Sequence, residues 1–191
     1  DRTVRALAAG AQTMVAHAVD GVLPAGAAGR DATGDIAPNA FAHPLLDEVG
    51  DPTEIGRSMS MIARFARDFG GVLADLDPDD QPMVVDPDDP APGLVAVPRS
   101  GGAGSTTFFF RKGGTESASV IDGSGRRITA DFGDRDWTWT LADADLAGRG
   151  RLDWTSAMPL ALVGGRLLVL TAAAGSEVEL SIDGRPLSTT A

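Results

Sequence analysis

The stretch DPTEIGRSMSMIARFARDFGGVLADL, Asp51 to Leu76, is the best-marked element of the sequence and divides the chain into two unlike halves. We expect Asp51 to be the N-cap of a helix, with Pro52 as its first residue and Glu54 completing a capping box. Apolar residues then recur every three or four positions, at Ile55, Met59, Ile62, Phe65 or Ala66, Phe69 and Leu73. This spacing predicts an amphipathic helix of about five to seven turns that buries one stripe against a neighbouring surface.

The end of this helix is marked by Gly70-Gly71. Each glycine lowers helix stability by about 1 kcal/mol relative to alanine, so the pair predicts a kink or an early end. The helix carries no chemistry of its own. It joins the two halves, and function must be sought on either side of it.

Composition excludes several classes of function. The chain has 191 residues, of which 43% are apolar, and a net charge of −11, which argues against a phosphate-binding surface for nucleic acid. No window approaches eighteen uninterrupted apolar residues, so we expect no membrane span. The absence of cysteine excludes disulfides and thiolate chemistry. The cellular compartment stays open, because a lost upstream segment would remove any export signal.

The first fifty residues are typical of a domain end. Residues 2 to 11 are helix-prone, and Gln12 to Val19 form a short apolar run that ends at Asp20-Gly21, as a buried strand followed by a turn would. Residues 21 to 50 are rich in glycine and proline, and such a long loop normally rests on a larger body. We therefore expect residues 1–50 to be the remnant of an α/β domain whose greater part lies outside this chain.

The C-terminal half is predicted to be all-β. Residues 77–93 hold five prolines among many aspartates, which indicates an acidic linker. From residue 94 the apolar pattern changes to a period of two, and glycine-containing turns separate nine short segments. The predicted strands are residues 94–98, 105–112, 117–122, 126–132, 137–141, 151–156, 159–163, 166–172 and 177–182. They predict an antiparallel β-sandwich over residues 94–191, with Phe108 and Phe110 facing one way and Phe109 the other.

The order of these parts resembles the end of the catalytic barrel and the following β domain of the family 35 glycoside hydrolases, the β-galactosidases. Three segments carry the resemblance. RALAAGAQTMVAHAVDGVLPAG, Arg5 to Gly26, is similar to that family's last barrel helix, last strand and following loop. PLLDEVGDPTE, Pro44 to Glu54, is similar to the segment that enters the helix leaving the barrel. STTFFFRKG and PLALVGGRLLVLTAAAGSEVELSI are similar to strands of its first β-rich domain.

The resemblance implies a mainly β fold, in which an antiparallel sandwich follows a long amphipathic helix and a barrel remnant. It implies the C-terminal portion of a β-galactosidase-like enzyme that buttresses a barrel supplied by an N-terminal segment or chain. The family's acid and nucleophile glutamates lie upstream of Asp1, so no catalytic residue is carried over. Most of its sugar-facing polar and aromatic residues are also replaced, for example by Val15, Ala16 and Phe41.

Several side chains suggest sites by themselves. His17 and Asp20, with His43, Asp35, Asp47 and Glu48, would supply metal ligands or an acid and a base, but their spacing fits no metal signature, and ordinary packing or loop hydrogen bonds are the favoured explanation. Asp47 and Glu48 are best explained as charging the entry to the joining helix. The run DLDPDD, Asp75 to Asp80, alternates carboxylates as calcium loops do, yet it lacks their central glycine and closing glutamate. We expect a solvated linker there, and no cofactor or metal.

Tryptophans offer the other candidate site. Trp137 and Trp139 would lie on one face of a strand, with Trp154 on another strand, and an exposed indole pair would stack on sugar rings. Half-buried core is the competing interpretation for alternate tryptophans. The alternative function is thus a non-catalytic carbohydrate-binding or structural sandwich module. In either case the expected partner is a β-galactoside or related glycan, and the substrate-contacting candidates are Trp137, Trp139, His17 and Asp20.

Overall fold

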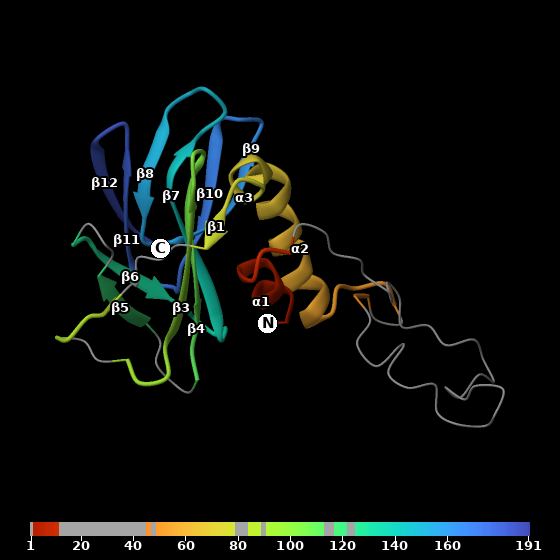
Figure 1. Ribbon diagram of the computed structural model, residues 1–191. Helices are drawn as coiled ribbons and strands as arrows, with labels where there is room; N and C mark the ends of the chain where they lie inside the picture. The colour runs from red at the N-terminus through yellow and green to blue at the C-terminus, as the bar shows by residue number, and fades with distance from the viewer. Residues whose placement is uncertain are drawn as a thin grey trace, which may run out of the picture. The chain divides into compact units, whose positions relative to one another are not determined.

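The computed structural model describes residues 2–11, 45–46, 49–78, 84–88, 91–112, 117–121 and 125–191. The protein is mainly β, as predicted, and its strands form one large antiparallel sheet and two smaller ones (Figure 1). The chain separates into two compact units, one formed by residues 1–12 and 64–191 and the other by residues 13–63. Among the described residues, no helix has the length and apolar character to cross a membrane.

All nine strands predicted between residues 94 and 182 are present. They are β3 (Val95–Gly101), β4 (Gly104–Phe110), β5 (Ser117–Ile121), β6 (Arg127–Asp131), β7 (Trp137–Asp145), β8 (Arg151–Thr155), β9 (Met158–Val163), β10 (Leu167–Thr171) and β11 (Glu177–Ile182). Their alternating apolar residues matched the pleat of a sheet with one or both faces buried, which is why the pattern located them.

Three further strands were missed. β1 (Asp77–Pro78) pairs with β3, and β2 (Val84–Val85) pairs with β5, so two short pieces of the stretch predicted as a linker are strands. β12 (Arg185–Thr190) forms a hairpin with β11 and is exposed along its whole length. A strand without a buried face needs no alternation of apolar and polar residues, so the sequence pattern does not predict β12.

The joining helix begins later than predicted. α2 (Glu54–Asp68) is capped by Thr53, whose hydroxyl oxygen accepts the backbone N–H of Gly56 at 3.1 Å. The N-cap prediction for Asp51 is therefore wrong. The residues before Thr53 are extended, because Pro52 bridges Leu46 and the Thr53 N–H donates to the Leu45 carbonyl at 3.0 Å. The same carbonyl leaves no room for a Cβ on Gly56, which explains a glycine inside the first turn.

The predicted interruption near Gly70-Gly71 is confirmed. α2 ends at Asp68, Phe69 leaves the helical region with ψ at 19°, and a single turn, α3 (Gly70–Leu73), follows. α2 is thus about four turns long at 3.6 residues per turn, which is shorter than the five to seven turns expected.

The seven-stranded sheet runs in the order β1-β3-β4-β7-β8-β11-β12. Its centre is buried on both faces, and the three phenylalanines of β4 divide between them as predicted. Phe108 and Phe110 lie opposite Trp139 and Trp137 in register, so these four rings share one face. Phe109 points to the other face, and all three phenylalanines are buried.

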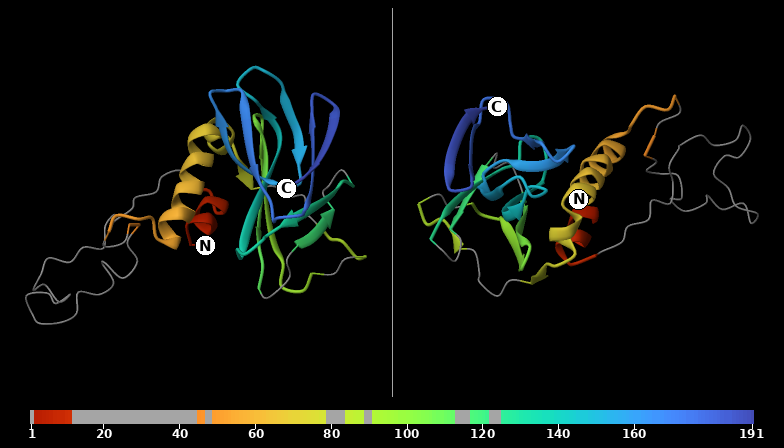
Figure 2. Two further views of the ribbon diagram at one scale, coloured as in Figure 1. Left: turned by 180° about the vertical axis from the view of Figure 1, so that it is seen from behind. Right: turned by 90° about the horizontal axis from the view of Figure 1, so that it is seen from above.

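Aromatic rings join the end of α2 to the first of these faces. The Phe65 ring lies 4.9 Å from the Trp139 ring, centroid to centroid, and Phe69 packs on Phe65 at 5.4 Å. Trp137 stacks on Trp139 almost parallel, with an interplanar angle of 3°. The helical turns from Arg64 to Leu73 thus extend an aromatic stack that begins in the sheet. Figure 2 shows the backbone of these turns beside the sheet.

Hydrogen bonds fix the same elements. The Asp68 carboxylate accepts the Leu162 N–H of β9 at 2.9 Å. The Arg99 guanidinium, on β3, donates to the carbonyl of Ala8 in α1 (Arg2–Ala8) at 3.2 Å and to that of Leu76 after α3 at 2.6 Å. One side chain therefore binds the carboxyl end of α1 and the segment that follows α3, and holds both on β3.

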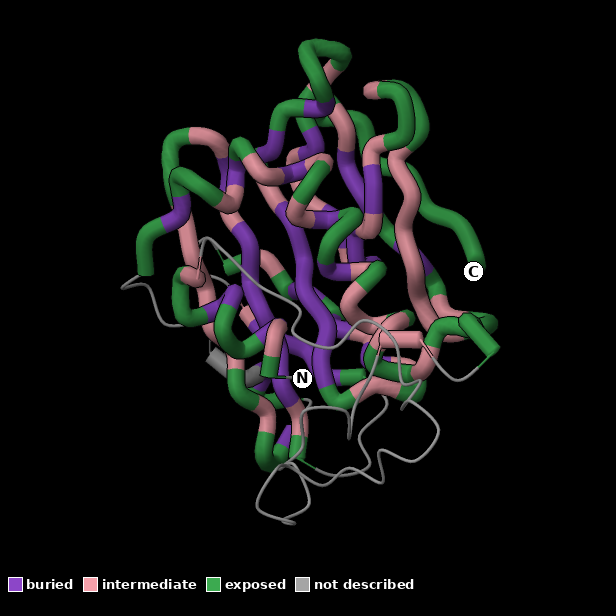
Figure 3. The backbone as a smooth tube through the Cα atoms, turned by 90° about the vertical axis from the view of Figure 1, so that its right-hand side faces the viewer, coloured by how far each residue is buried: buried purple, intermediate pink, exposed green. Residues whose placement is uncertain are grey.

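The opposite face carries a smaller sheet of three strands, in the order β2-β5-β6. Its apolar side packs around Phe109 in a core cluster that also contains Ala91, Ala118, Val120, Ile128, Ala130 and Phe132. Figure 3 shows the resulting pattern, with buried backbone through the central strands and exposed loops at their ends.

The β9–β10 hairpin is turned by Gly164-Gly165, as the sequence predicts. Both glycines have positive φ, 59° and 64°. A two-residue turn of this type requires positive φ at both central positions, which glycine adopts without strain.

Helix burial yields a stability prediction. Ile55, Met59, Ile62 and Phe69 are predicted to be buried. Ile62 and Phe69 are buried and Met59 is half-buried, whereas Ile55 is 40% exposed because it lies in the first turn. Phe69→Ala should lower the free energy of unfolding by about 3 to 5 kcal/mol, since it removes a fully buried ring from the aromatic stack. Urea denaturation followed by tryptophan fluorescence measures this change.

Ile55→Ala is the matched control and should change stability by about 0.5 kcal/mol or less, as exposed substitutions do. Equal unfolding midpoints for Phe69→Ala and Ile55→Ala would contradict the burial described above.

Candidate functional site

The tryptophan pair named from the sequence lies in the core. Trp137 is 4% exposed and Trp139 is fully buried, with its indole N–H donating to the Pro159 carbonyl at 3.0 Å. Their faces are occupied by each other and by Phe65. The pair is therefore a packing element, and the expectation of an exposed indole platform on β7 is corrected.

The remaining sequence candidates contribute no described site. His17, Asp20, Asp35, His43, Asp47 and Glu48 lie outside the described residues. In the acidic run, Asp75 accepts the Ala103 N–H at 3.1 Å, and Asp79 and Asp80 are outside the described part. No group of three or more His, Asp or Glu side chains suited to a metal ion occurs within the described ranges.

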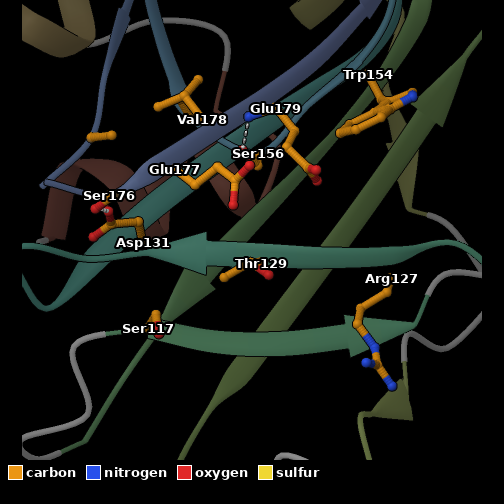
Figure 4. Close-up of a pocket in the computed structure, with 12 residues that line it drawn as sticks. Ser117, Arg127, Thr129, Asp131, Trp154, Ser156, Ser176, Glu177, Val178 and Glu179 are labelled. Atoms are coloured by element: carbon orange, nitrogen blue, oxygen red, sulfur yellow. Dashed lines mark hydrogen bonds between the residues drawn. The ribbon is translucent and has the colours of Figure 1, made fainter. Parts of the chain in front are cut away.

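A cavity of about 460 Å³ opens between the β5–β6 strands and the β8–β11 strands. Its lining is mostly polar (Figure 4): Ser117, Arg127, Thr129, Asp131, Trp154, Ser156, Ala157, Ala172, Ser176, Glu177, Val178 and Glu179. Its volume lies within the range of small-molecule binding sites. It is the candidate site, and we refer to it as the inter-sheet groove.

One wall of the inter-sheet groove is built by β11. Glu177 and Glu179 are exposed, and Val178 between them is buried, as the two-residue period of a strand dictates. The backbone of Glu179 is held by Ser156, whose N–H donates to the Glu179 carbonyl at 2.8 Å and whose hydroxyl accepts the Glu179 N–H at 2.9 Å. Two carboxylates thus project from a fixed strand on one side of the groove.

Trp154 extends this wall. It lies on β8, in register with Ala142 of β7 and Ser181 of β11, and it is partly exposed. Figure 4 shows its indole at one end of the groove, beside Glu179. Unlike the β7 pair, this indole is accessible from the groove. Its place on a separate strand was predicted, but only the tertiary structure sets it beside two glutamates.

Asp131, at the end of β6, has a structural role. Its carboxylate accepts the Ser176 hydroxyl at 2.5 Å and the N–H groups of Ala173 and Gly133, each at 2.9 Å. Burial raises the pKa of this carboxyl, but these hydrogen bonds, led by that from Ser176, outweigh it and leave the pKa below its ordinary value. Asp131 is thus ionised and ties the 173–176 loop to the small sheet.

Arg127 has its charge balanced outside the groove. Its Nε lies 2.5 Å from the carboxylate of Asp86, which is buried, and its guanidinium reaches Asp88 at 3.5 Å. Among the described residues, neither Glu177 nor Glu179 forms an ion pair. The groove therefore presents uncompensated negative charge together with an indole and hydroxyl groups.

This arrangement suits binding better than hydrolysis. A glycosidase places two carboxyl groups on either side of the scissile bond. Glu177 and Glu179 project from the same strand face, and Asp131 is saturated with hydrogen-bond donors. No matched acid and nucleophile are therefore found in the groove.

Comparison with known proteins provides no further assignment. No protein-family model matches the sequence, and no curated protein matches it significantly.

The state of Asp131 predicts a dependence of stability on pH. Because the pKa of Asp131 is lower in the folded protein than the ordinary pKa of an aspartate, its stabilising contribution is complete above that ordinary value. This contribution is lost as pH falls through the folded pKa, since protonation removes the negative charge that strengthens the three hydrogen bonds.

Asp131→Asn should therefore be less stable than the unchanged protein at pH 7, and the difference should shrink below about pH 4, where the aspartate protonates. Urea midpoints measured from pH 7 to pH 2.5 test this. If the difference in stability between Asp131→Asn and the unchanged protein stays constant from pH 7 to pH 2.5, the ionised Asp131 carboxylate does not stabilise the fold.

Proposed function

We propose that this chain is the C-terminal portion of a β-galactosidase-like glycoside hydrolase, in which it buttresses a catalytic barrel. In this proposal, residues 1–50 complete the barrel and α2 leaves it. The sheets of residues 94–191 form the sandwich that supports it. The acid and nucleophile carboxylates belong to the barrel part, upstream of residue 1.

The observation that carries the proposal is the attachment of the exit helix. A buttress must transmit position, and a helix connected only by a flexible linker would not do so. Here the end of α2 is built into the sheet by the Phe65 stack and by the hydrogen bond from Leu162 to Asp68. The end of the helix is therefore part of the packed β unit, which supports a structural role for residues 64–191.

The distribution of carboxylates also supports a non-catalytic role. Retaining glycosidases need two carboxyl groups about 5 to 5.5 Å apart with separate acid and nucleophile roles. In the described part of the chain, the groove glutamates share one strand face and Asp131 is held as a structural anion. The chemistry would then have to come from elsewhere in the complete enzyme.

A second candidate function is a non-catalytic carbohydrate-binding module. The original basis for it, the Trp137 and Trp139 pair, is buried. The inter-sheet groove, where Trp154 lies beside Glu179, favours this function on a different set of residues.

The buttress proposal predicts that the 191-residue chain does not hydrolyse aryl β-galactosides at any pH. Protonation of the leaving oxygen and attack on the anomeric carbon each need a positioned carboxyl, and the pair is supplied by the barrel. A chromogenic galactoside assay on purified chain, freed of host enzyme, measures this, and a longer product of the same gene that includes upstream sequence should be active.

Turnover by the chain alone would overturn the proposal if it disappeared in Glu48→Ala or Glu179→Gln and survived in the control Glu116→Ala. An inactive longer product whose upstream sequence contains no paired glutamates would also overturn it.

A further inference from the structure

We propose that the inter-sheet groove is a binding subsite for a neutral, β-linked galactose-containing glycan. In this subsite Trp154 stacks on a sugar ring, and Glu177 and Glu179 accept hydrogen bonds from its hydroxyl groups. The choice of galactose rests on the proposed function, whereas the choice of a neutral sugar rests on the groove itself.

The chemistry of one wall matches the two kinds of surface that a pyranose ring offers. A sugar has an apolar face of C–H groups, which an accessible indole face covers, and a rim of hydroxyl groups. Carboxylates accept hydrogen bonds from such hydroxyls with the strength of charge-assisted bonds. Trp154 and Glu179 lie side by side in Figure 4, so one ring would meet both.

The opposite wall distinguishes a sugar from an ion. It presents Ser117 and Thr129, whose hydroxyl groups both donate and accept. A cationic ligand would need acceptors alone, and an anion would be repelled by Glu177 and Glu179, because Arg127 is already paired with Asp86 and Asp88. A polyhydroxylated neutral ligand uses donors and acceptors on both walls.

The groove is fixed before any ligand arrives. Ser156 holds the Glu179 backbone, and Asp131 ties the 173–176 loop to β6 through Ser176 and Ala173. A site held in this way loses little conformational freedom on binding, which favours affinity for a ligand with few strong contacts.

Titration of the 191-residue chain with methyl β-galactoside and with a β-linked galactotetraose tests the proposal. Calorimetry gives the affinity, and intrinsic fluorescence reports on Trp154, since Trp137 and Trp139 are buried. We expect the tetraose to bind, and Trp154→Ala and the double variant Glu177→Gln/Glu179→Gln each to weaken its binding at least tenfold. Trp154→Phe should retain part of the affinity, because it keeps an aromatic face.

Glu54→Gln, at the start of α2 and outside the groove, is the matched control and should bind as the unchanged chain does. Circular dichroism and urea unfolding of each variant separate loss of binding from loss of fold. If Trp154→Ala does not fold, Trp154→Phe and the glutamine variants carry the test.

Three results would overturn the subsite. They are the absence of glycan binding by the folded, unchanged chain, binding that the groove variants leave intact, and binding of a lysine-rich peptide in preference to any glycan. Absence of binding with an active longer gene product would remove the subsite and leave the buttress proposal standing. Binding of a glycan that lacks galactose would keep a sugar site but overturn its galactose specificity.

Discussion

The structure depends on one aromatic stack, in which Phe65 of α2 lies on Trp139 of β7, with Phe69 and Trp137 at its two ends. Trp139 is fully buried, and its single polar atom is satisfied by the Pro159 carbonyl. The stack removes a large apolar area from water and fixes the helix on the sheet face at one place. The hydrogen bond from the Leu162 N–H to Asp68 then holds the last residue of α2 on β9.

The faces of the large sheet are covered by other elements at its centre but not at one edge, and this explains where a site can exist. Around β4 and β7 both faces are covered, by helical turns on one side and by the Phe109 cluster on the other. Towards β11 and β12 the strands lose this cover, and β12 is exposed throughout. The inter-sheet groove lies at this transition, where polar strand faces approach each other without closing into a core.

The charged groups in and around the groove differ in whether they have hydrogen-bond or ion-pair partners. The Asp131 carboxylate accepts a hydrogen bond from Ser176, and Arg127 forms ion pairs with Asp86 and Asp88. Glu177 and Glu179 are left exposed on one strand face, next to an accessible indole. The proposed buttressing and sugar-binding roles are therefore compatible. The first uses the sheet face on which the helical turns pack, and the second uses the inter-sheet groove.

The sequence by itself determined the β-rich class, the nine principal strands, the opposite facing of Phe108 and Phe109, and the break near Gly70. These features follow from local periodicity and glycine chemistry, which are properties of neighbouring residues. Tertiary structure alone decided that Trp137 and Trp139 are buried while Trp154 is accessible, because a period of two places a side chain on a face without saying what covers that face. It also decided that Thr53 caps α2, since the extended pairing of Pro52 with Leu46 displaced the helix start, and that Glu179 and Thr129, fifty residues apart, line one groove.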